Sequence, residues 1–269
     1  MTQSYALDQI IEDMGETGVQ VTELGAAEGS AGNISVFVKQ LEGVNNRFPL
    51  QGEMDLPAKV SALVDGWVVI TATGRRLRDV SKKPEATLCL LKIIGDGTRA
   101  QIYAAPSLRP TSEYNSHLAI QDDQVARFGW EYHAVLHAQP LYMTYLSHLE
   151  NKYPDTQSLN YRLLRWEPET AYVFQAGIGM LPFQIPGSPE LMDATVAGLR
   201  EHRAVVWQRH GMVSRSENNV IQTADLIEYA ETVAHYEFLN LLMGEPTIGI
   251  SDDQFHNFCT RLGIKQKFI

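Results

Sequence analysis

The sequence predicts an α/β protein built as one domain, in which helices cover a mixed β-sheet. Three observations lead to that prediction. Helical periodicities and short β-branched runs follow one another along the chain. The 269 residues, 44% of them hydrophobic, are enough to bury one large core. No repeat, low-complexity linker or shift in composition marks a boundary, so we expect a single domain over residues 1–269.

The first half of the chain favours strands after an initial helix. Helical spacing of the apolar residues from Leu7 to Met14 predicts that helix, and Gly15 and Gly18 should weaken its later part. Residues 41–62 hold scattered Gly, Pro and Asn and are expected to form a loop. A Gly-Asp-Gly-Thr turn at residues 95–98 lies between two apolar runs and predicts a hairpin. The strands expected in this half cover residues 33–38, 67–73, 88–94 and 100–104.

The second half favours helices separated by short extended segments. Pro140 should end one of those segments, because proline cannot donate to a ladder. Helices are expected over residues 111–128, 141–150, 157–166, 189–202, 220–243 and 252–262. Extended segments are expected over residues 134–139, 171–174, 180–183 and 204–207.

Charge and cysteine content exclude several classes of partner. With 22 basic and 32 acidic side chains the formal net charge is −10, which argues against binding nucleic acid or an anionic membrane through a basic face. This net charge is still compatible with a local cationic pocket for one small anion. Cys89 and Cys259 are expected to be two buried thiols. The start lacks a secretory signal, and the apolar runs are too short to cross a bilayer, so we expect a cytoplasmic protein.

Two histidines and one acid stand where a metal ion could bind. His137 closes an apolar strand, and His210 follows another strand at a His-Gly turn; ligands gather at such strand ends. Glu113 lies at an expected helix start. Two histidines and a carboxylate from separate elements are a usual ligand set for zinc or a similar ion. Plainer alternatives are a core histidine bonded to a backbone carbonyl and an acid within a helix cap.

Three short loops of small residues could together hold a phosphate. They lie at residues 30–33, 71–74 and 110–113, each at the edge of an expected strand or helix. Their backbone amides and hydroxyls could surround an anion, although each loop by itself is an ordinary turn. The sequence has no Walker loop, and no Gly-x-Gly-x-x-Gly follows a strand, so a nucleotide-driven reaction has no support.

Five short motifs, taken in order, resemble those of the class II sugar-phosphate aldolases, in the aldolase/adducin superfamily. They read SAGNIS at residues 30–35, TATG at 71–74, PTSE at 110–113, LHAQP at 136–140 and RHG at 209–211. Within that superfamily the rhamnulose-1-phosphate aldolases are the most similar. Their resemblance rests on LRWEPE at residues 164–169, GIGMLP at 177–182 and IPGSPE at 185–190. The similarity continues through the long final helix and covers nearly the whole chain.

The resemblance implies a fold, an assembly and a reaction. The implied fold has three layers around a largely antiparallel central sheet, and the implied assembly is a homotetramer with one zinc ion in each subunit. The implied reaction is reversible cleavage of L-rhamnulose 1-phosphate to dihydroxyacetone phosphate and L-lactaldehyde through a metal-stabilised enediolate. A Lewis-acidic metal and a carboxylate that moves a proton are the groups such chemistry needs.

The resemblance also assigns roles to individual residues. His137 and His210 fall on metal-ligand positions, and Glu113 falls on the position of the catalytic acid/base. Glu169 matches a second active-site carboxylate, with Glu167 as the alternative register. The phosphate-binding positions fall on Gly32, Asn33, Thr73, Gly74, Thr111 and Ser112.

One residue departs from the family pattern at the expected metal site. The family has His-x-His at this strand end, but here Gln139 takes the place of the second histidine. Residues 137 and 139 share a face of the strand, so both side chains could reach one ion. An amide oxygen is a weaker ligand than imidazole, so we expect lower zinc affinity or a shift toward manganese or cobalt. His133 shares that face but lies roughly 13 Å away along the strand.

Three functions remain open on the sequence. The first is a metal-dependent rhamnulose-1-phosphate aldolase with an altered ligand set. The second is a related aldolase or epimerase-type enzyme that acts on another sugar phosphate or carries out another reaction through the same enediolate chemistry. The third is a non-catalytic, adducin-like assembly module. His117, one turn beyond Glu113, is expected to serve helix packing rather than the site.

Overall fold

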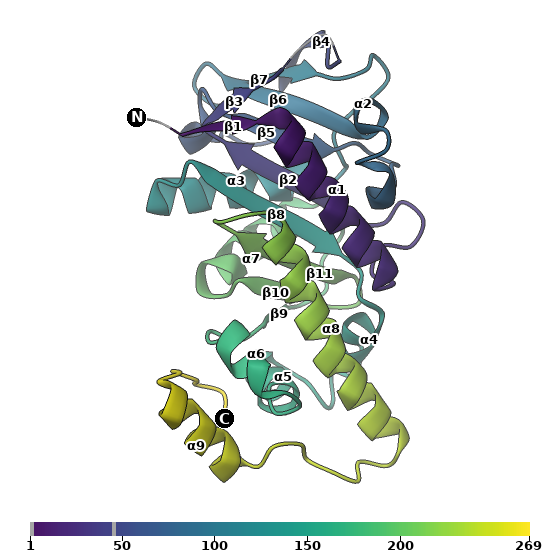
Figure 1. The fold of residues 1–269 in the computed structure, drawn as a ribbon, viewed down its shortest axis with the longest axis vertical. Helices are drawn as coiled ribbons and strands as arrows, with labels where there is room; N and C mark the ends of the chain where they lie inside the picture. Colours follow the sequence, from purple (N-terminus) through teal and green to yellow (C-terminus); the bar gives the residue numbers. More distant parts are fainter. Residues whose placement is uncertain (1–2, 45–46) are drawn as a thin grey trace.

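A computed structural model describes residues 3–44 and 47–269, and one large sheet organises them (Figure 1). Neighbouring strands of this sheet are antiparallel except β9 and β10, which confirms a mixed, largely antiparallel sheet. In order across the sheet the strands are β4 (Leu50–Asp55), β7 (Arg99–Tyr103), β6 (Leu88–Ile94), β5 (Trp67–Thr71), β2 (Asn33–Val38), β8 (Tyr132–Ala138), β11 (Gly211–Ser216), β10 (Ala204–Trp207) and β9 (Gly179–Leu181).

Helices cover both faces of this sheet. Figure 1 shows α1 (Leu7–Glu23) and α8 (Ile221–Leu242) crossing the nearer face, with α3 (Tyr114–Phe128) and α7 (Pro189–Glu201) behind it. Alternate residues of β8 enter different layers: Leu136 packs in the core that includes α1 and α8, whereas Val135 packs with α3 and α7. Because strand side chains alternate, His137 points toward the layer of α3. The predicted α/β class is confirmed.

The remaining elements are short and frame the large sheet. The predicted hairpin is confirmed as β6 and β7, and the long final helix as α8. The other elements are β1 (Ser4–Ala6), β3 (Gln40–Glu42), η1 (Ser61–Leu63), η2 (Leu77–Asp79), α2 (Pro84–Thr87), α4 (Leu141–Leu146), α5 (Thr156–Leu163), α6 (Pro168–Val173) and α9 (Asp252–Leu262).

The glycines of α1 serve packing and do not interrupt the helix. The helix continues through both of them to Glu23. A Cβ atom on Gly18 would lie 2.4 Å from the carbonyl oxygen of Leu77, and one on Gly15 would lie 2.5 Å from Cβ of Ser81. Glycine at these two positions therefore lets the helix approach η2 more closely than a residue with a side chain would allow. The close packing offsets the low helix propensity of glycine.

Three sequence predictions were wrong or incomplete. The expected loop over residues 41–62 contains β4, which pairs with β7; residues 45 and 46 of that range lie outside the described part. The segment 171–174 is not extended, because its first three residues belong to α6, which begins with Pro168 at its first position. No strand was predicted at β11, because its sequence GMVSRS shows no alternation of apolar and polar residues, although all six residues are buried.

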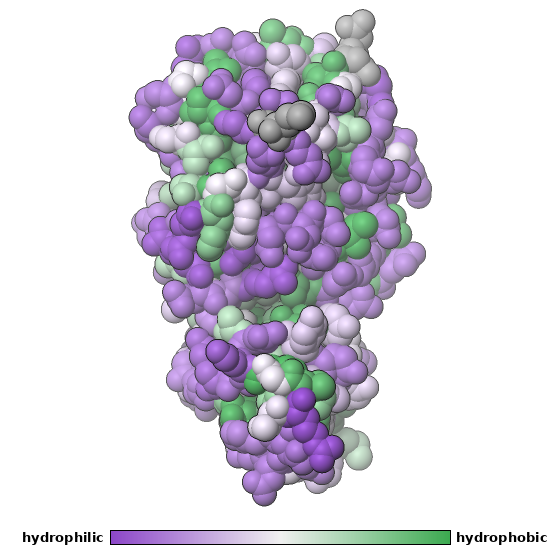
Figure 2. Space-filling model, turned by 60° about the vertical axis from the view of Figure 1, so that its left-hand side comes forward, coloured by the Kyte–Doolittle hydropathy of each residue, from purple (hydrophilic) through white to green (hydrophobic). Residues whose placement is uncertain are grey.

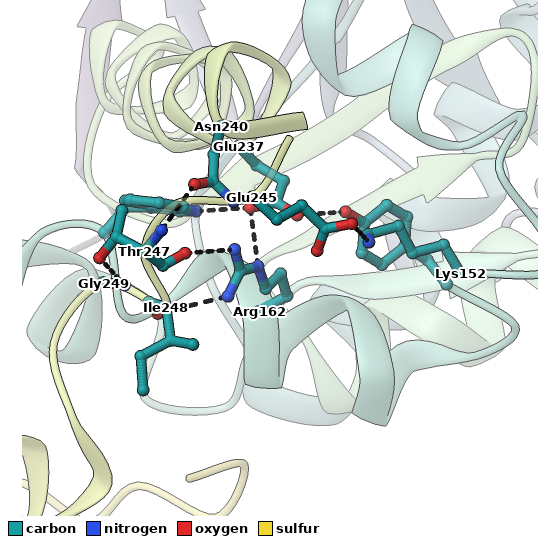
Figure 3. Close-up of polar contacts among 10 residues, drawn as sticks. Lys152, Arg162, Glu237, Asn240, Glu245, Thr247, Ile248 and Gly249 are labelled. Carbon is teal, nitrogen blue, oxygen red and sulfur yellow. Dashed lines mark hydrogen bonds and ion pairs between the residues drawn. The ribbon is translucent and has the colours of Figure 1, made fainter. Parts of the chain in front are cut away.

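The segment that follows α8 is held by polar contacts around the buried carboxylate of Glu237 (Figure 3). The Nε atom of Arg162 on α5 donates to Glu237 on α8 over 2.8 Å, and Glu237 has no exposed surface. Arg162 also donates to the carbonyl oxygens of Thr247 and Ile248, at 3.1 and 3.4 Å. One guanidinium thus joins two helices to the chain that leads into α9.

The surface of the molecule is largely hydrophilic on the face drawn in Figure 2, where hydrophobic residues form small separate groups. Over residues 3–44 and 47–269, none of the helices has both the length and the hydropathy that a membrane crossing requires. Cys89 and Cys259 are both buried and free, as expected.

Candidate metal centre and active site

The candidate site forms where the ends of three central strands meet. Asn33, the first residue of β2, lies opposite His137 near the end of β8. On the other side of β8, His137 lies opposite Val213 of β11, and the turn that precedes β11 carries His210. Glu113 comes immediately before α3, which packs over β8. Segments far apart in the sequence therefore deliver all four side chains to one place.

The carboxylate of Glu113 lies between the two histidines. Its Oε2 is 3.7 Å from Nε2 of His137, and its Oε1 is 3.6 Å from Nε2 of His210. The three groups place their ligand atoms within 4.8 Å of one another. Glu113 and His137 are buried, and His210 is partly exposed. The structure thus brings together the three residues that the sequence singled out.

Hydrogen bonding fixes which nitrogen of His137 faces the carboxylate. Nδ1 of His137 lies 2.9 Å from the backbone carbonyl oxygen of Met212, an acceptor, so Nδ1 carries the proton. The lone pair of a neutral ring is then on Nε2, which points toward Glu113. His137 is therefore bonded to a backbone carbonyl through Nδ1, as the plainer alternative predicted. Its Nε2 is still available to a ligand. Metal-binding histidines commonly carry such an outer hydrogen bond.

Charges at the cluster leave it ready for a cation. Burial, and after it the neighbouring His137, lowers the pKa of His210 to about 4, so its ring is neutral at pH 7. Burial by itself would raise the pKa of Glu113, but His137, the hydrogen bond from Asn33 and His210 hold that pKa below its usual value. An ionised carboxylate therefore faces the Nε2 atoms of two imidazoles beyond hydrogen-bonding distance. This donor set fits a divalent cation such as zinc.

Glu113 does not act as a helix cap. It occupies the N-cap position of α3, but its side chain makes no capping hydrogen bond. Instead Nδ2 of Asn33 donates to its Oε2 over 2.7 Å. The hydroxyl of Thr111 accepts from the backbone N–H of Glu113 at 3.4 Å, which supplies part of the expected cap. The acid is thereby turned away from the helix and toward the histidines.

The three small-residue loops converge around this cluster. The backbone N–H of Thr73 donates to the carbonyl of Arg109, and that of Ile34 donates to the hydroxyl of Thr71. Gly32 has a φ of +80°, and a Cβ there would lie 2.9 Å from the carbonyl oxygen of His137, so only glycine fits. The loops at 30–33 and 110–113 thus carry Asn33 and Glu113 of the cluster, and the loop at 71–74 is hydrogen-bonded beside both of them.

The predicted phosphate-binding residues differ in their exposure. Thr73, Gly74 and Ser112 are exposed, whereas Thr111 is buried. Asn33 is also buried, and its side chain is engaged with Glu113 and His117. A phosphate role for these loops stays a prediction.

The three remaining candidate site residues have different surroundings; they are Gln139, Glu169 and Glu167. Gln139 and His210 line a hollow of about 630 Å³, which has room for a small sugar phosphate. Glu169 is exposed in the first turn of α6, and α6 packs on α8 and α9. Glu167 lines a separate hollow with Asp225 and Glu228. Neither acid belongs to the cluster around Glu113 within the described residues.

Sequence reasoning missed two features of the site. Trp207 packs against both histidines, with ring centroids 4.7 Å from His137 and 5.0 Å from His210. Its place three residues before His210, at the end of a buried strand, was an available signal. His117 was assigned to helix packing, but its ring hydrogen-bonds to Asn33. No local pattern could show that contact, because it crosses between α3 and β2.

Comparison with known proteins gives a consistent picture. The sequence profile described as Class II Aldolase and Adducin N-terminal domain matches residues 12–238. A rhamnulose-1-phosphate aldolase from Bacteroides thetaiotaomicron is 25% identical over 253 residues, which cover 93% of this chain and 92% of the relative.

Solved structures agree with that similarity. A sugar-phosphate aldolase from Thermotoga maritima is 26% identical, with a TM-score of 0.75 over 90% of this chain and 98% of its own. An L-fuculose-1-phosphate aldolase from Thermus thermophilus shares the fold, with 18% identity and a TM-score of 0.58 over 89% of this chain and 97% of its own.

Proposed function

This chain belongs to the class II aldolase and adducin family, and from that premise we propose that it is a metal-dependent aldolase acting on a phosphorylated ketose. One observation carries the proposal: Glu113, His137 and His210 meet at the strand ends where three small-residue loops converge. An assembly module would have no need for a buried carboxylate that faces two imidazole nitrogens without a counter-charge.

We propose L-rhamnulose 1-phosphate as the substrate, with dihydroxyacetone phosphate and L-lactaldehyde as products. The similarity to rhamnulose-1-phosphate aldolases over nearly the full chain supports this choice. We further propose zinc as the ion, with manganese or cobalt as alternatives, a homotetramer as the assembly and the cytoplasm as the location.

The proposed chemistry uses the chain's own groups at defined points. When bound by His137, His210 and Glu113, a divalent cation would supply Lewis-acid stabilisation of negative charge on the substrate's oxygen atoms. Cleavage breaks the bond between C3 and C4 of the ketose. The C4 hydroxyl loses a proton as the aldehyde forms, and the electron pair left on the ketone fragment takes up a proton at C3. We assign both transfers to Glu113, which Asn33 holds in place: its ionised carboxylate takes up the proton of the C4 hydroxyl and then delivers a proton to C3.

Further residues complete the proposed site. Backbone amides and hydroxyls of Gly32, Asn33, Thr73, Gly74, Thr111 and Ser112 would surround the phosphate, and Arg75 and Arg76, exposed directly after Gly74, would add positive charge. We propose Gln139 as an oxygen ligand. We retain Glu169 as the second carboxylate. Since Glu169 lies outside the cluster of its own chain, this role requires that a neighbouring copy bring it to the site.

A metal analysis combined with an aldol cleavage assay tests the proposal. Purified protein should carry close to one divalent ion per chain and release dihydroxyacetone phosphate from L-rhamnulose 1-phosphate in a coupled assay. L-fuculose 1-phosphate serves as a second substrate, and L-rhamnulose without its phosphate is the control. Folded protein that cleaves neither phosphate ester after reconstitution with zinc, manganese or cobalt would refute the aldolase proposal. Cleavage of L-fuculose 1-phosphate alone would refute only the substrate.

A further inference from the structure

An unbroken line of buried hydrogen bonds leads from the interior of the protein to Glu113. It connects side chains of β8, α3 and β2, and every member is at most 6% exposed. In order the members are His133, Gln121, Ser35, His117, Asn33 and Glu113. Apart from the contact between His117 and Asn33, the bonded atoms are 2.5 to 3.0 Å apart. We refer to these six side chains as the buried chain.

The direction of every bond in the buried chain follows from its last member. An ionised Glu113 can only accept, so the amide nitrogen of Asn33 donates to it and the amide oxygen of Asn33 must accept. Nε2 of His117 is the atom that faces this oxygen, so Nε2 carries the proton. Nδ1 of His117 is then an acceptor, and the hydroxyl of Ser35 donates to it over 2.7 Å. The tautomer of His117 is thereby fixed from one side by Glu113.

The same reasoning continues to the far end of the buried chain. The amide nitrogen of Gln121 donates to the oxygen of Ser35 over 3.0 Å. The amide oxygen of Gln121 therefore accepts from Nδ1 of His133 over 2.5 Å. Nε2 of His133 is left without a proton, which agrees with its having no donor or acceptor among the described residues. All five hydrogen bonds consequently point toward Glu113, and such aligned bonds strengthen one another.

The buried chain cannot transport protons, because two of its links are amides. An amide would have to pass through an unstable imidic acid to hand a proton from one side to the other, so Asn33 and Gln121 block a relay. Both imidazoles also stay neutral, since burial lowers the pKa of His117 and of His133 to about 3. What the arrangement does provide is a fixed orientation: the proton on Nε2 of His117 holds the amide of Asn33, which holds one oxygen of Glu113.

We propose that His117 is a positioning residue that fixes the side chain of Glu113 by orienting the amide of Asn33. The inference rests on the proposed function for its effect on turnover, but the tautomer of His117 is a property of the folded chain alone. Without the donor on His117 the buried amide oxygen of Asn33 would lose its hydrogen-bond partner, and the Asn33 side chain could shift to regain one and move Glu113 with it. Displacement of a reacting group by about 1 Å can lower a rate by about 100-fold.

The test compares two amide substitutions with an apolar one. In His117→Gln the amide nitrogen can take the place of Nε2 and still donate to Asn33. In His117→Asn the shorter side chain reaches only the position of Nδ1, so the donor is lost, as it also is in His117→Leu. We expect kcat to fall about 10- to 100-fold in the Asn and Leu variants with KM within about threefold of the wild type. His117→Gln should restore kcat to within about fivefold. His256→Gln, on the exposed side of α9, is the control and should match the wild type.

Nitrogen NMR of wild-type protein labelled at the histidine ring nitrogens gives a readout that does not need activity. His117 should show a proton on Nε2 only, at pH 7, in the absence and in the presence of zinc. A proton on Nδ1, or on both nitrogens, would overturn the proposal whether or not the protein cleaves any sugar phosphate. Equal kcat values for the Gln and Asn variants would overturn it too. A wild-type protein that is inactive but shows the Nε2 tautomer would instead refute the proposed function. If His117→Leu does not fold, the comparison of His117→Gln with His117→Asn and the NMR measurement still test the proposal.

Discussion

Two buried carboxylates, Glu237 and Glu113, show how one residue type serves structure in one region and chemistry in another. Glu237 has no exposed surface and accepts hydrogen bonds from Tyr153, Arg162 and Trp166. The guanidinium balances its charge, and Figure 3 shows the pair joined to the chain beyond α8. Both oxygen atoms of Glu237 are therefore engaged by side chains of the same chain, and none is available to a ligand.

Glu113 is also buried, at 6% exposed, but has different surroundings. It receives one hydrogen bond, from Asn33, and otherwise faces two imidazole nitrogens beyond hydrogen-bonding distance. Within the described residues no lysine or arginine side chain forms an ion pair with it. A buried carboxylate that is balanced within its own chain is therefore structural, whereas one left without a counter-charge marks a site for an external cation.

The largest expected effect comes from removing the charge of each carboxylate in turn. Glu113→Gln should lower kcat by about 100- to 10,000-fold, because it removes the proposed acid/base group, and should change the free energy of unfolding little. Glu237→Gln should leave the turnover of the folded fraction unchanged. Activity assays together with urea titrations measure both quantities. A Glu237 variant that is fully stable but inactive would reverse the assignment of the two regions.

The next largest effect concerns stability. Glu237→Ala leaves Arg162 without its partner inside the protein, and we expect a loss of about 3 kcal/mol in the free energy of unfolding. Lys152→Ala removes an exposed ion pair with Glu245 in the same region and is the matched control, with a much smaller loss expected. Comparable losses in the two variants would show that the buried pair has no special weight.

Acid should destabilise the region of Glu113 before that of Glu237. His117 and His133 have pKa values lowered to about 3 by burial, whereas histidines of the unfolded chain titrate near 6.5. Below pH 6.5 the unfolded state therefore binds more protons, and stability falls as the pH falls toward 3. The expected loss between pH 6.5 and 5 is about 2 kcal/mol for each histidine.

Urea unfolding of metal-free protein between pH 7 and 5 measures this dependence. In His133→Asn, whose amide keeps a donor near Gln121, the slope of stability against pH should decrease by one proton. An unchanged slope would show that His133 is not held neutral. The partners of Glu237 are Tyr, Arg and Trp, which do not titrate in this range.

The smallest expected effect concerns the affinity of the Glu113 site for a metal ion. Gln139→His adds an imidazole on the side of the hollow that His210 also lines, so zinc affinity should rise by about tenfold or more if residue 139 faces the ion. A competition titration with a zinc chelator measures it, and His148→Gln, in the same hollow, is the control. Unchanged affinity would place residue 139 outside the coordination sphere.

Local patterns were enough to predict most of the fold. The alternation in residues 33–38, the Gly-rich turn at 95–98 and the helical spacing of residues 220–243 all correspond to elements of the structure. The prediction of α6 failed because four apolar or aromatic residues at 171–174 suit a strand, while Pro168 and burial against α8 favour a helix. β4 was missed because none of its residues is buried at this edge of the sheet, and its sequence carries little apolar pattern.

The sequence by itself determined the α/β class, the family and the three residues His137, His210 and Glu113, because spacing along one chain segment defines strand ends, helix starts and motifs. Only the tertiary structure decided what those residues do to one another. Glu113 turns from a helix cap toward imidazoles that come from other elements of the chain. Asn33 holds Glu113, and His117 orients Asn33, through contacts between residues 80 or more positions apart. Such contacts arise from packing α3 against β2 and β8, and no local propensity encodes them.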